Sequence, residues 1–481
     1  MKEQTSDHRL QAVRLSKEGN ALVLRSKSYE IGMEAENRKR LREQGMKLCR
    51  CSQQLYEEYL RNSAYRCLLV FSIESIGAQY GIGTYIKQLI QCFDREEWDV
   101  NIITLHATNL SEVNFRMEEH VAWYDFPTPE ERINSNAPIH EEKYLKSIFY
   151  YWASRIGDGR KVFCHFNFPT HNLLASLFKE RLRTPILFTL HYTGWSFDLL
   201  GNVQLLKYFL DQPSNNIKRV FEQEKSFMEK YCDRIITIAQ HSYKMVRDIY
   251  GIPLEKIVCI PNGLQDDYKE RSIEECNALR HKYHYTSSEK IIVFTGRLDI
   301  VKGIIELIKA FNEVIEVLPE ARLILAGSGN FVRCLETASP CWKHITFTGY
   351  IPKEQLYELY AIADLGVVPS IHEEFGYVAT EMMLNRLPIV VHNTTGLNEI
   401  SDNGRYATTF SFDESRNCNP LKEAIINALN KKKTKQQKDE ARNRVLNNYT
   451  IPQFQEQIKS VYACMENPYR VINNLKQKNH D

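Results

Sequence analysis

The sequence lacks the features that mark membrane-spanning, secreted and zinc-finger chains. No run of about 18 consecutive apolar residues occurs, so we expect no helix that spans a bilayer. The first ten residues, MKEQTSDHRL, hold no apolar stretch of the kind that a secretory signal needs. The 12 cysteines form no C-x-x-C pair, which argues against a zinc ribbon and predicts reduced thiols in a cytoplasmic protein.

An excess of charge of one sign is also missing. The 62 Lys and Arg residues nearly balance 60 Asp and Glu residues, which argues against general nucleic-acid binding. Residues 1–66 differ, with 14 basic and nine acidic side chains, and residues 29–60 contain no proline. We expect a basic helical extension there, with Gly45 as a candidate break. It is either solvated or self-packed, or it is a docking arm for a protein or the inner face of a membrane.

From residue 67 onward, short apolar runs alternate with stretches of helical spacing. Expected strands fall at 67–73, 98–105, 161–168, 184–191, 234–239, 256–262, 290–296, 321–327, 344–349, 365–370 and 387–392. This alternation is typical of parallel α/β units. The rhythm is interrupted at residues 261–270, which predicts two doubly wound domains over 67–268 and 269–450, followed by a helix and tail over 451–481.

Ligands of open parallel sheets bind beyond the carboxyl ends of the strands, so the residues that follow each strand are the candidates. Gly81 and Gly83 come after the first strand, where a helix start could accept a phosphate or a sugar. A tight turn is the alternative, and Ile86 breaks the dinucleotide motif G-x-G-x-x-G. Arg297 and Lys302 follow a strand of the second domain and could bind a diphosphate, or form an ordinary surface pair.

Two acidic residues, Glu373 and Glu381, stand eight positions apart in the second domain. We expect Glu373 to precede a helix that begins at the Phe-Gly-Tyr sequence, and Glu381 to lie two turns inside it. Carboxylates accept hydrogen bonds from sugar hydroxyls, so this pair could hold two parts of one extended ligand. The alternative is that both are solvated or cap the helix. Glu374 is a competitor for the first position.

Single histidines give weaker signals. His191 ends a strand, where ligand-facing groups are presented, although a lone histidine is usually structural. Asn262 and Gly263 read as a turn. His165 and His171 are six residues apart with a proline between them, a poor spacing for metal ligands, so we expect no metal site.

Several longer motifs resemble a known family. GRLDIVKGIIELIKAF, LILAGSGN, HEEFGYVATEMM and PIVVHNTTGLNEI are similar to the donor-binding half of the retaining glycosyltransferases of family 4, which have the GT-B architecture. FTLH, RIITIAQHS, IPNG and GIGTYIKQL resemble the acceptor half of that family. The resemblance covers about residues 67–466. HFNFPTH and HYTGWSFDLLGN are also similar to a Bacteroidetes subgroup associated with peptide-maturation genes.

The resemblance implies two Rossmann-like domains that face a cleft, with the last helix crossing back to the first domain. It implies a donor-binding role for Gly83, Arg297, Lys302, Glu373, Phe375, Gly376, Tyr377 and Glu381. Among these, the two basic residues would bind the diphosphate, Glu381 the ribose hydroxyls, and Glu373 with the Phe-Gly-Tyr backbone the transferred sugar. His191 would lie near the reacting carbon, so the expected catalytic groups are Glu373, His191, Arg297 and Lys302.

The activity that the resemblance implies is transfer of a hexose, with retention and without a metal or cofactor. The donor would be a UDP- or GDP-sugar, and the acceptor a hydroxyl of a glycan, a lipid-linked sugar or a peptide. The chain departs from the family pattern at Glu374, where the family often has Pro or Gly, and at Arg386-Leu387-Pro388. The extra carboxylate leaves the identity of the donor in doubt.

Two other function classes stay open. A GT-B fold that has lost catalysis could bind a sugar or a partner protein. A sugar-nucleotide epimerase or a phosphorylase could also use this fold, although we identify no lysine for a pyridoxal Schiff base. Detection of transfer or hydrolysis separates an enzyme from a binding protein, and analysis of the product, glycoside or epimer, separates the enzymes.

Overall fold

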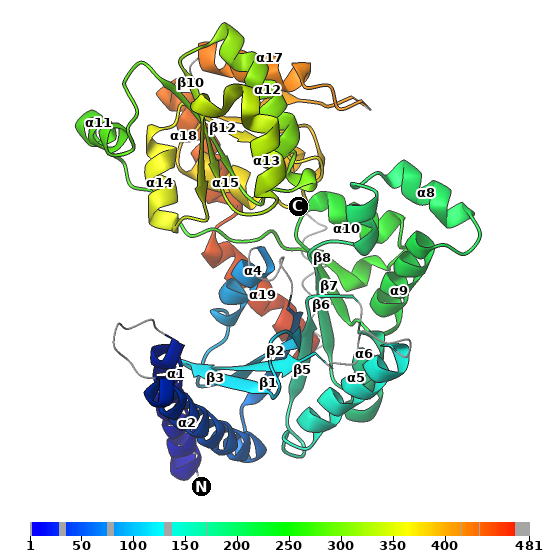
Figure 1. The fold of residues 1–481 in the computed structure, drawn as a ribbon. Helices are drawn as coiled ribbons and strands as arrows, with labels where there is room; N and C mark the ends of the chain where they lie inside the picture. The colour runs from blue at the N-terminus through cyan, green and yellow to red at the C-terminus, as the bar shows by residue number, and fades with distance from the viewer. Residues whose placement is uncertain are drawn as a thin grey trace.

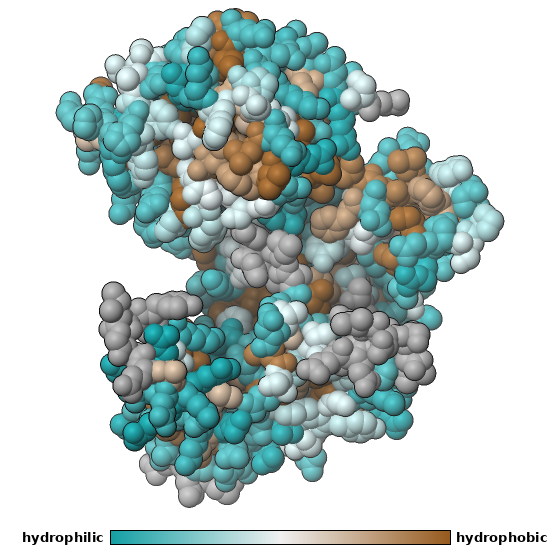
Figure 2. Space-filling view, viewed as in Figure 1, coloured by the Kyte–Doolittle hydropathy of each residue, from teal (hydrophilic) through white to brown (hydrophobic). Residues whose placement is uncertain are grey.

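The computed structural model describes residues 2–27, 35–74, 81–128, 137–169, 171–413, 415–431 and 433–466. Two largely parallel β-sheets, each covered by helices on both faces, form two lobes with a hollow between them (Figures 1 and 2). This arrangement confirms the predicted α/β fold with two Rossmann-like domains. Within these ranges no helix combines the length and apolarity that crossing a bilayer requires.

The first sheet has eight strands in the order β3-β4-β2-β1-β5-β6-β7-β8, and β3 is antiparallel to β4. Its strands are β1 (Arg66–Ile73), β2 (Trp98–Ala107), β3 (Asn114–Glu118), β4 (Val121–Pro127), β5 (Val162–Phe166), β6 (Ile186–Leu190), β7 (Arg234–Thr237) and β8 (Ile257–Cys259). Sequence analysis did not predict β3 and β4, because β3 is short and alternates buried with exposed residues instead of forming a continuous apolar run.

The helices of the first domain divide between the two faces of its sheet. They are α4 (Gly81–Ile90), α5 (Ala137–Ala153), α6 (Asn172–Leu182), α7 (Gly194–Asp198), α8 (Val203–Asp211), α9 (Asn216–Lys230) and α10 (Gln240–Asp248). One core joins α5, α6 and α9 to the sheet, and Phe71 stacks on Phe166 within it at 4.7 Å between ring centroids. A second core on the other face contains the apolar residues of α4.

The N-terminal extension forms two long helices, α1 (Lys2–Lys27) and α2 (Ala35–Asn62), which lie beside β3 (dark blue in Figure 1). Gly45 does not break α2, so the expected interruption is wrong. A Cβ atom on Gly45 would stand 2.6 Å from the carbonyl oxygen of Gly19 in α1. Glycine is therefore needed there because the two helix backbones approach closely, and the helix continues through it.

The second sheet has six parallel strands in the order β11-β10-β9-β12-β13-β14. They are β9 (Lys290–Thr295), β10 (Ala321–Ala326), β11 (Ile345–Gly349), β12 (Leu365–Val368), β13 (Ile389–His392) and β14 (Thr408–Phe410). The surrounding helices are α11 (Ile273–Lys282), α12 (Ile304–Val317), α13 (Phe331–Ala338), α14 (Lys353–Ile362), α15 (Tyr377–Leu384), α16 (Thr395–Ser401), α17 (Asn419–Asn430) and α18 (Lys435–Asn448). Sequence analysis did not predict β14, which is only three residues long.

The last described helix, α19 (Ile451–Glu466), leaves the second domain and packs against the first (Figure 1). Phe454, Ile458 and Tyr462 join the core that also holds the apolar face of α4. The Tyr462 hydroxyl lies 2.8 Å from Nδ1 of His165 on β5. The helix thus ties the two domains together on the side away from α5 and α6.

Candidate functional site

A cavity of about 480 Å³ lies between the two domains. The first domain lines it with the start of α4, the residues after β6 and the turn after β8, which include Gly81, His191 and Asn262. The second domain lines it with residues that follow β9 and β12. Because these segments follow parallel strands, the carboxyl ends of both sheets meet at the cavity, where open α/β sheets bind ligands. We call it the interdomain cavity.

Two cations of the second domain line this cavity next to the end of β9. Arg297 follows the strand, and Lys302 ends the short 3₁₀ helix Ile300–Lys302. Asp299 holds them in place: its carboxylate accepts a hydrogen bond from the backbone N–H of Lys302 at 3.0 Å and pairs with Nη2 of Arg297 at 3.1 Å. The next residue, Gly303, has φ 66°, a conformation that favours glycine. A Cβ atom there would overlap the Pro369 carbonyl oxygen, so a side chain has no room.

Glu373 faces the same cavity and is held by three groups. Its Oε2 lies 2.6 Å from Nζ of Lys302 and accepts a hydrogen bond from the Ser370 hydroxyl at 3.1 Å. Its backbone N–H donates to Oγ1 of Thr395 at 3.3 Å. The structure therefore brings the expected cation and the expected carboxylate into direct contact. An ammonium has three N–H donors, so Lys302 can keep this partner and still bind an anion.

Helix α15 begins at the wall of the cavity. Gly376 precedes its first residue with φ 103°, a conformation that favours glycine, and Phe375, Gly376 and Tyr377 all line the cavity. The first N–H groups of a helix lack partners within the helix and form its positive end. The cavity wall therefore offers N–H donors to an oxygen-rich ligand, next to the Glu373 carboxylate.

Glu381 lies on α15 one turn beyond Tyr377, not two turns inside as expected, because the helix begins only at Tyr377; it is on the same side of the helix as Tyr377. Glu381 itself does not line the cavity. Glu381 is partly buried, and this desolvation raises the pKa of its carboxyl to about 7, because the opposing attraction of Lys353 is too weak to cancel it. A carboxyl whose pKa is raised by burial beside a cleft is typical of a binding or catalytic site.

His191 lines the cavity from the end of β6, and its hydrogen bonds define its tautomer. The side-chain N–H₂ of Asn167 donates to the Phe71 carbonyl at 3.1 Å, which leaves Asn167 Oδ1 to face Nε2 of His191 at 2.9 Å. Nε2 must therefore carry the proton, and Nδ1 is an acceptor. Burial lowers the pKa of His191 to about 3, so the imidazole is neutral at physiological pH. Sequence analysis missed Asn167, which only the fold brings to His191.

Glu374 also lines the cavity, and two imidazoles contact its carboxylate. Its carboxylate lies 2.7 Å from Nε2 of His241 on α10 and 3.0 Å from Nε2 of His372. These contacts hold the pKa of Glu374 at about 2, against the effect of its burial. Because His241 belongs to the first domain, this carboxylate bridges the two domains. The extra acid expected beside the sugar is thus bound to two histidines, a pairing that no sequence motif indicates.

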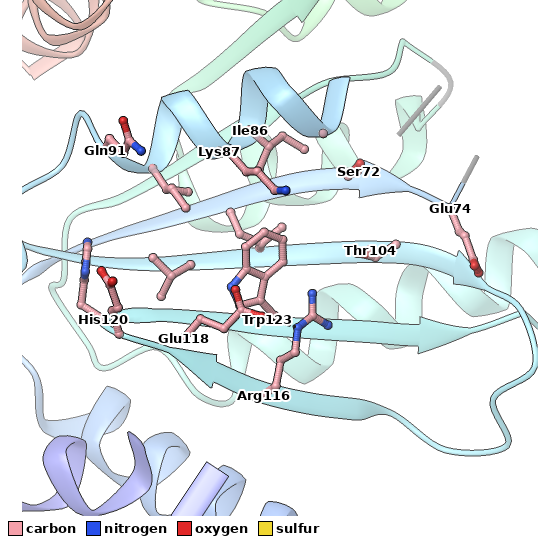
Figure 3. A pocket seen from close by; sticks show the side chains of 15 residues that line it. Ser72, Glu74, Ile86, Lys87, Gln91, Thr104, Arg116, Glu118, His120 and Trp123 are labelled. Atoms are coloured by element: carbon pink, nitrogen blue, oxygen red, sulfur yellow. Dashed lines mark hydrogen bonds and ion pairs between the residues drawn. The ribbon is translucent and has the colours of Figure 1, made fainter. Parts of the chain in front are cut away.

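A second hollow, of about 710 Å³, lies on the first domain next to the start of α4. Figure 3 shows Lys87 and Gln91 of α4 above the sheet, with Arg116 and Trp123 of strands β3 and β4 opposite them. We call it the sheet groove. Gly83 lines the groove, whereas Gly81 and Ile82 line the interdomain cavity. The first turn of α4 therefore separates the two hollows, and Gly83 is not in contact with the cavity.

Two family models match most of the chain. "Glycosyltransferase Family 4" matches residues 80–268, and "Glycosyl transferases group 1" matches residues 277–444. An uncharacterised glycosyltransferase of Methanocaldococcus jannaschii is 31% identical over 50% of this chain and 59% of its own length. The mannosylfructose-phosphate synthase of Agrobacterium fabrum is 30% identical over 47% of this chain and 52% of its own length. The chain thus spans about half of the curated relatives that it matches.

Solved structures share the fold over both domains. Sucrose-phosphate synthase of Thermosynechococcus elongatus has a TM-score of 0.64 at 20% identity, over 83% of this chain and 98% of its own. HepE of Anabaena, solved with UDP and glucose, has a TM-score of 0.60 at 16% identity, over 82% of this chain and 99% of its own. The family models cover both lobes, and these structures reproduce the arrangement of the lobes. The chain therefore belongs to the glycosyltransferases of the family 4 type with the GT-B fold.

Proposed function

We propose that the protein transfers a hexose from a UDP- or GDP-sugar to an acceptor hydroxyl. The observation that carries this proposal is the convergence of Arg297, Lys302, Glu373 and the start of α15 on one cavity between the domains. Cations suit a diphosphate, and carboxylates and N–H groups suit a sugar. The binding of UDP-glucose by HepE, a protein of the same fold, supports a donor of this class.

The two cations would act on the leaving group. When the bond between the sugar and the diphosphate breaks, negative charge grows on the phosphate. Cations that are already in position stabilise this transition state more than they stabilise the bound substrate. Arg297 and Lys302 are held for this role by Asp299. Because Arg297, Lys302 and the N–H groups at the start of α15 could stabilise the phosphates, we propose that the reaction needs no divalent metal. Initial rates should be independent of added Mg²⁺ or Mn²⁺ and should persist immediately after excess chelator is added.

Glu373 and His191 would hold the sugar from two sides. Glu373, fixed by Lys302 and Ser370, can accept hydrogen bonds from sugar hydroxyls. His191 offers the lone pair of Nδ1 to another hydroxyl, because its Nε2–H is bound to Asn167. A neutral His191 with a lowered pKa can orient a hydroxyl through Nδ1, but it is a poor base and does not add positive charge near the reacting carbon. Both residues therefore position the substrate, and neither carries a proton that it could donate as a general acid.

We propose that the anomeric configuration is retained, with the acceptor attacking from the face that the diphosphate leaves. The leaving phosphate would take the acceptor proton, and Glu373 would orient the sugar instead of forming a covalent bond. Retaining glycosidases use two carboxyl groups about 5 Å apart. Here the nearest polar partners of Glu373 are a lysine and a serine, an arrangement that favours orientation over double displacement.

The ribose of the donor would reach Glu381 along the same side of α15. The Oδ1 atom of Asn262 offers a further acceptor at the cavity: it is buried and has no hydrogen-bond partner within the described part of the chain. We propose that the sheet groove receives the acceptor, since it adjoins the interdomain cavity on the other side of the first turn of α4. The indole N–H of Trp123 there is buried without a partner among the described residues, and the Arg116 guanidinium lies 4.7 Å from the centroid of its ring.

A binding screen followed by product analysis tests the proposal. Calorimetry of the full chain with UDP-, GDP-, ADP- and dTDP-sugars should give binding to one nucleotide class, UDP or GDP, and that donor should be hydrolysed or transferred. Binding without turnover of any donor would favour a sugar-binding protein, and an epimerised donor would favour an epimerase. A cytoplasmic location, and membership of the subgroup associated with peptide maturation, remain parts of the same proposal.

A further inference from the structure

Outside both hollows, three potential metal ligands of the first domain come together. His106 belongs to the end of β2, Glu141 to the second turn of α5, and His171 directly precedes α6. One ligand atom of each residue lies within 4.8 Å of the others. The residues are 30 or more positions apart, so only the fold brings them together. His165, whose spacing from His171 in the sequence is poor for metal ligands, contacts Tyr462 and Thr189.

The spacing of the donor atoms matches a metal site. Nε2 of His106 and Oε1 of Glu141 are 3.2 Å apart. Two ligands that bind one zinc ion at about 2.1 Å in tetrahedral geometry are separated by about 3.4 Å. The imidazole rings of His106 and His171 are inclined by 22°, with centroids 6.0 Å apart. Small side-chain movements would therefore suffice to place all three atoms around one ion.

Burial leaves one side of the cluster accessible. His106 and His171 are 8% and 4% exposed, whereas the Glu141 side chain keeps 31% of its surface exposed. Three protein ligands with one accessible side are the arrangement in which zinc takes a water molecule as its fourth ligand. Two imidazoles and one carboxylate suit zinc better than calcium or magnesium, which prefer oxygen ligands.

The backbone of His106 is fixed by the helix that supplies Glu141. His106 has φ 57°, in the left-handed region that few residues other than glycine adopt. Its N–H donates to the hydroxyl of Tyr144 at 3.0 Å, and Tyr144 lies three residues after Glu141 on α5. The same helix therefore holds two of the three ligands in relation to each other. Such supporting contacts orient metal ligands in established sites.

We propose that His106, Glu141 and His171 bind one Zn²⁺ ion that cross-links the end of β2, α5 and the start of α6. None of these three residues lines the interdomain cavity or the sheet groove. The ion would therefore lie away from the proposed site of sugar transfer, and the proposed reaction remains independent of added metal. The prediction from sequence that the chain has no metal site is revised in this one respect.

Metal analysis of the purified full-length protein tests the site. Wild-type protein prepared with zinc in the medium should hold about one zinc ion per chain after desalting. Glu141→Gln, which keeps the size of the side chain but removes its charge and one acceptor oxygen, and His171→Asn should each retain less than about a tenth of that zinc. His281→Asn, on the exposed surface of α11, is the matched control and should retain it. Iron or nickel at that stoichiometry in place of zinc would overturn the assignment.

Thermal unfolding distinguishes the site from an ordinary histidine–glutamate pair. Prolonged dialysis against a chelator should lower the Tm of the wild-type protein by several degrees, and Zn²⁺, but not Mg²⁺, should restore it. The Tm of Glu141→Gln should respond to neither treatment. Apo protein loaded with Co²⁺ should show the visible absorption bands of a tetrahedral ion. A wild-type protein without bound metal, whose Tm is insensitive to chelator and zinc, would refute the proposal.

Discussion

At the residue scale, Lys302 should contribute directly to the binding of the nucleoside diphosphate. In Lys302→Ala we expect the affinity for the nucleoside diphosphate to fall by about 10- to 100-fold, the usual effect of losing a hydrogen bond to a charged group. The loss also leaves Glu373 without its cation at 2.6 Å, so that its charge repels the phosphate. Calorimetric titration measures the change.

The control for this variant is Lys309→Ala, which removes an exposed lysine from α12, the helix that begins just after Lys302. It should bind the nucleotide as the wild-type protein does. Lys309→Ala should change the free energy of unfolding by less than about 0.5 kcal/mol. Lys302→Ala should lose some stability, because the Glu373 side chain, only 16% exposed, is left without its cation, so the affinity is measured well below the Tm of the variant. Wild-type affinity in Lys302→Ala would remove this residue from the diphosphate site.

Glu381 should make nucleotide binding depend on pH. Ribose hydroxyls donate hydrogen bonds, so they bind the carboxylate form, but the pKa of Glu381 is raised to about 7. The affinity for the nucleotide should therefore rise between pH 5.5 and pH 7.5, and binding should release a proton, which calorimetry in buffers of different ionisation enthalpy detects. Glu381→Gln should bind more weakly and lose this pH dependence. An unchanged pH dependence in the variant would contradict the ribose role.

The same raised pKa affects stability with a defined sign. Since the folded protein holds the proton of Glu381 more tightly than the unfolded chain, this group favours folding below its ordinary pKa of 4.5, and the effect is lost as the pH rises towards 7. Between pH 5 and pH 7.5 the free energy of unfolding of the wild-type protein should therefore fall by more than that of Glu381→Gln. The difference between the two proteins should be on the order of 2 kcal/mol. Denaturant titrations at pH 5 and pH 7.5 test it. Glu224, whose pKa is also raised to about 7, contributes the same trend in both proteins.

At the scale of elements, the contact between α10 and the loop before α15 should hold the domains together. His241 on α10 touches Glu374, and the neighbouring backbone N–H of Gln240 donates to Glu399 on α16 at 2.7 Å. In His241→Ala the Glu374 carboxylate loses its partner in the first domain. We expect a larger radius of gyration by small-angle scattering and a higher KM for the donor, with a smaller effect on kcat.

The matched change on the same helix is Lys244→Ala, at an exposed position of α10. It should leave both the scattering curve and the KM unchanged. If His241→Ala behaves like Lys244→Ala, the bridge through Glu374 does not control the separation of the domains.

The helices α1 and α2 should be part of the folded first domain, because their contacts with it include a buried acid. Asp99 on β2 is fully buried and binds the hydroxyl of Tyr59 at 2.7 Å, and it pairs with Arg160. Tyr59→Phe removes one donor from this carboxylate and should lower the free energy of unfolding by about 1.5–3 kcal/mol. Tyr65→Phe, whose ring is 39% exposed, is the control and should change it by less than about 0.5 kcal/mol.

Deletion of the N-terminal extension, α1 and α2, should destabilise the first domain. Ser16 accepts a hydrogen bond from the backbone of Met117 on β3 at 2.7 Å, and Tyr56 packs against Phe115 of the same strand. Without α1 and α2 the edge strand would be uncovered, and we expect aggregation of the truncated chain. A truncated chain that stays monomeric with unchanged Tm would show that the extension is an independent docking arm.

At the scale of the whole molecule, the sequence predicted what depends on local pattern. Continuous apolar strands such as β1 and β9 were found, and so were the residues that follow them, including Arg297 and Lys302. Strands β3, β4 and β14 were not predicted because they are short or alternate in burial. The partners of the site were also missed: Asn167 beside His191, and His241 beside Glu374, come from strands and helices whose proximity only the tertiary fold creates.

The most direct test of the account is a structure of the full chain with the nucleotide sugar that it binds most tightly. The account predicts the diphosphate within hydrogen-bonding distance of Arg297 and Lys302, the ribose on Glu381, and the sugar between Glu373 and His191. It would be contradicted by a nucleotide bound elsewhere on the protein, or by one in the cavity whose phosphates touch neither cation.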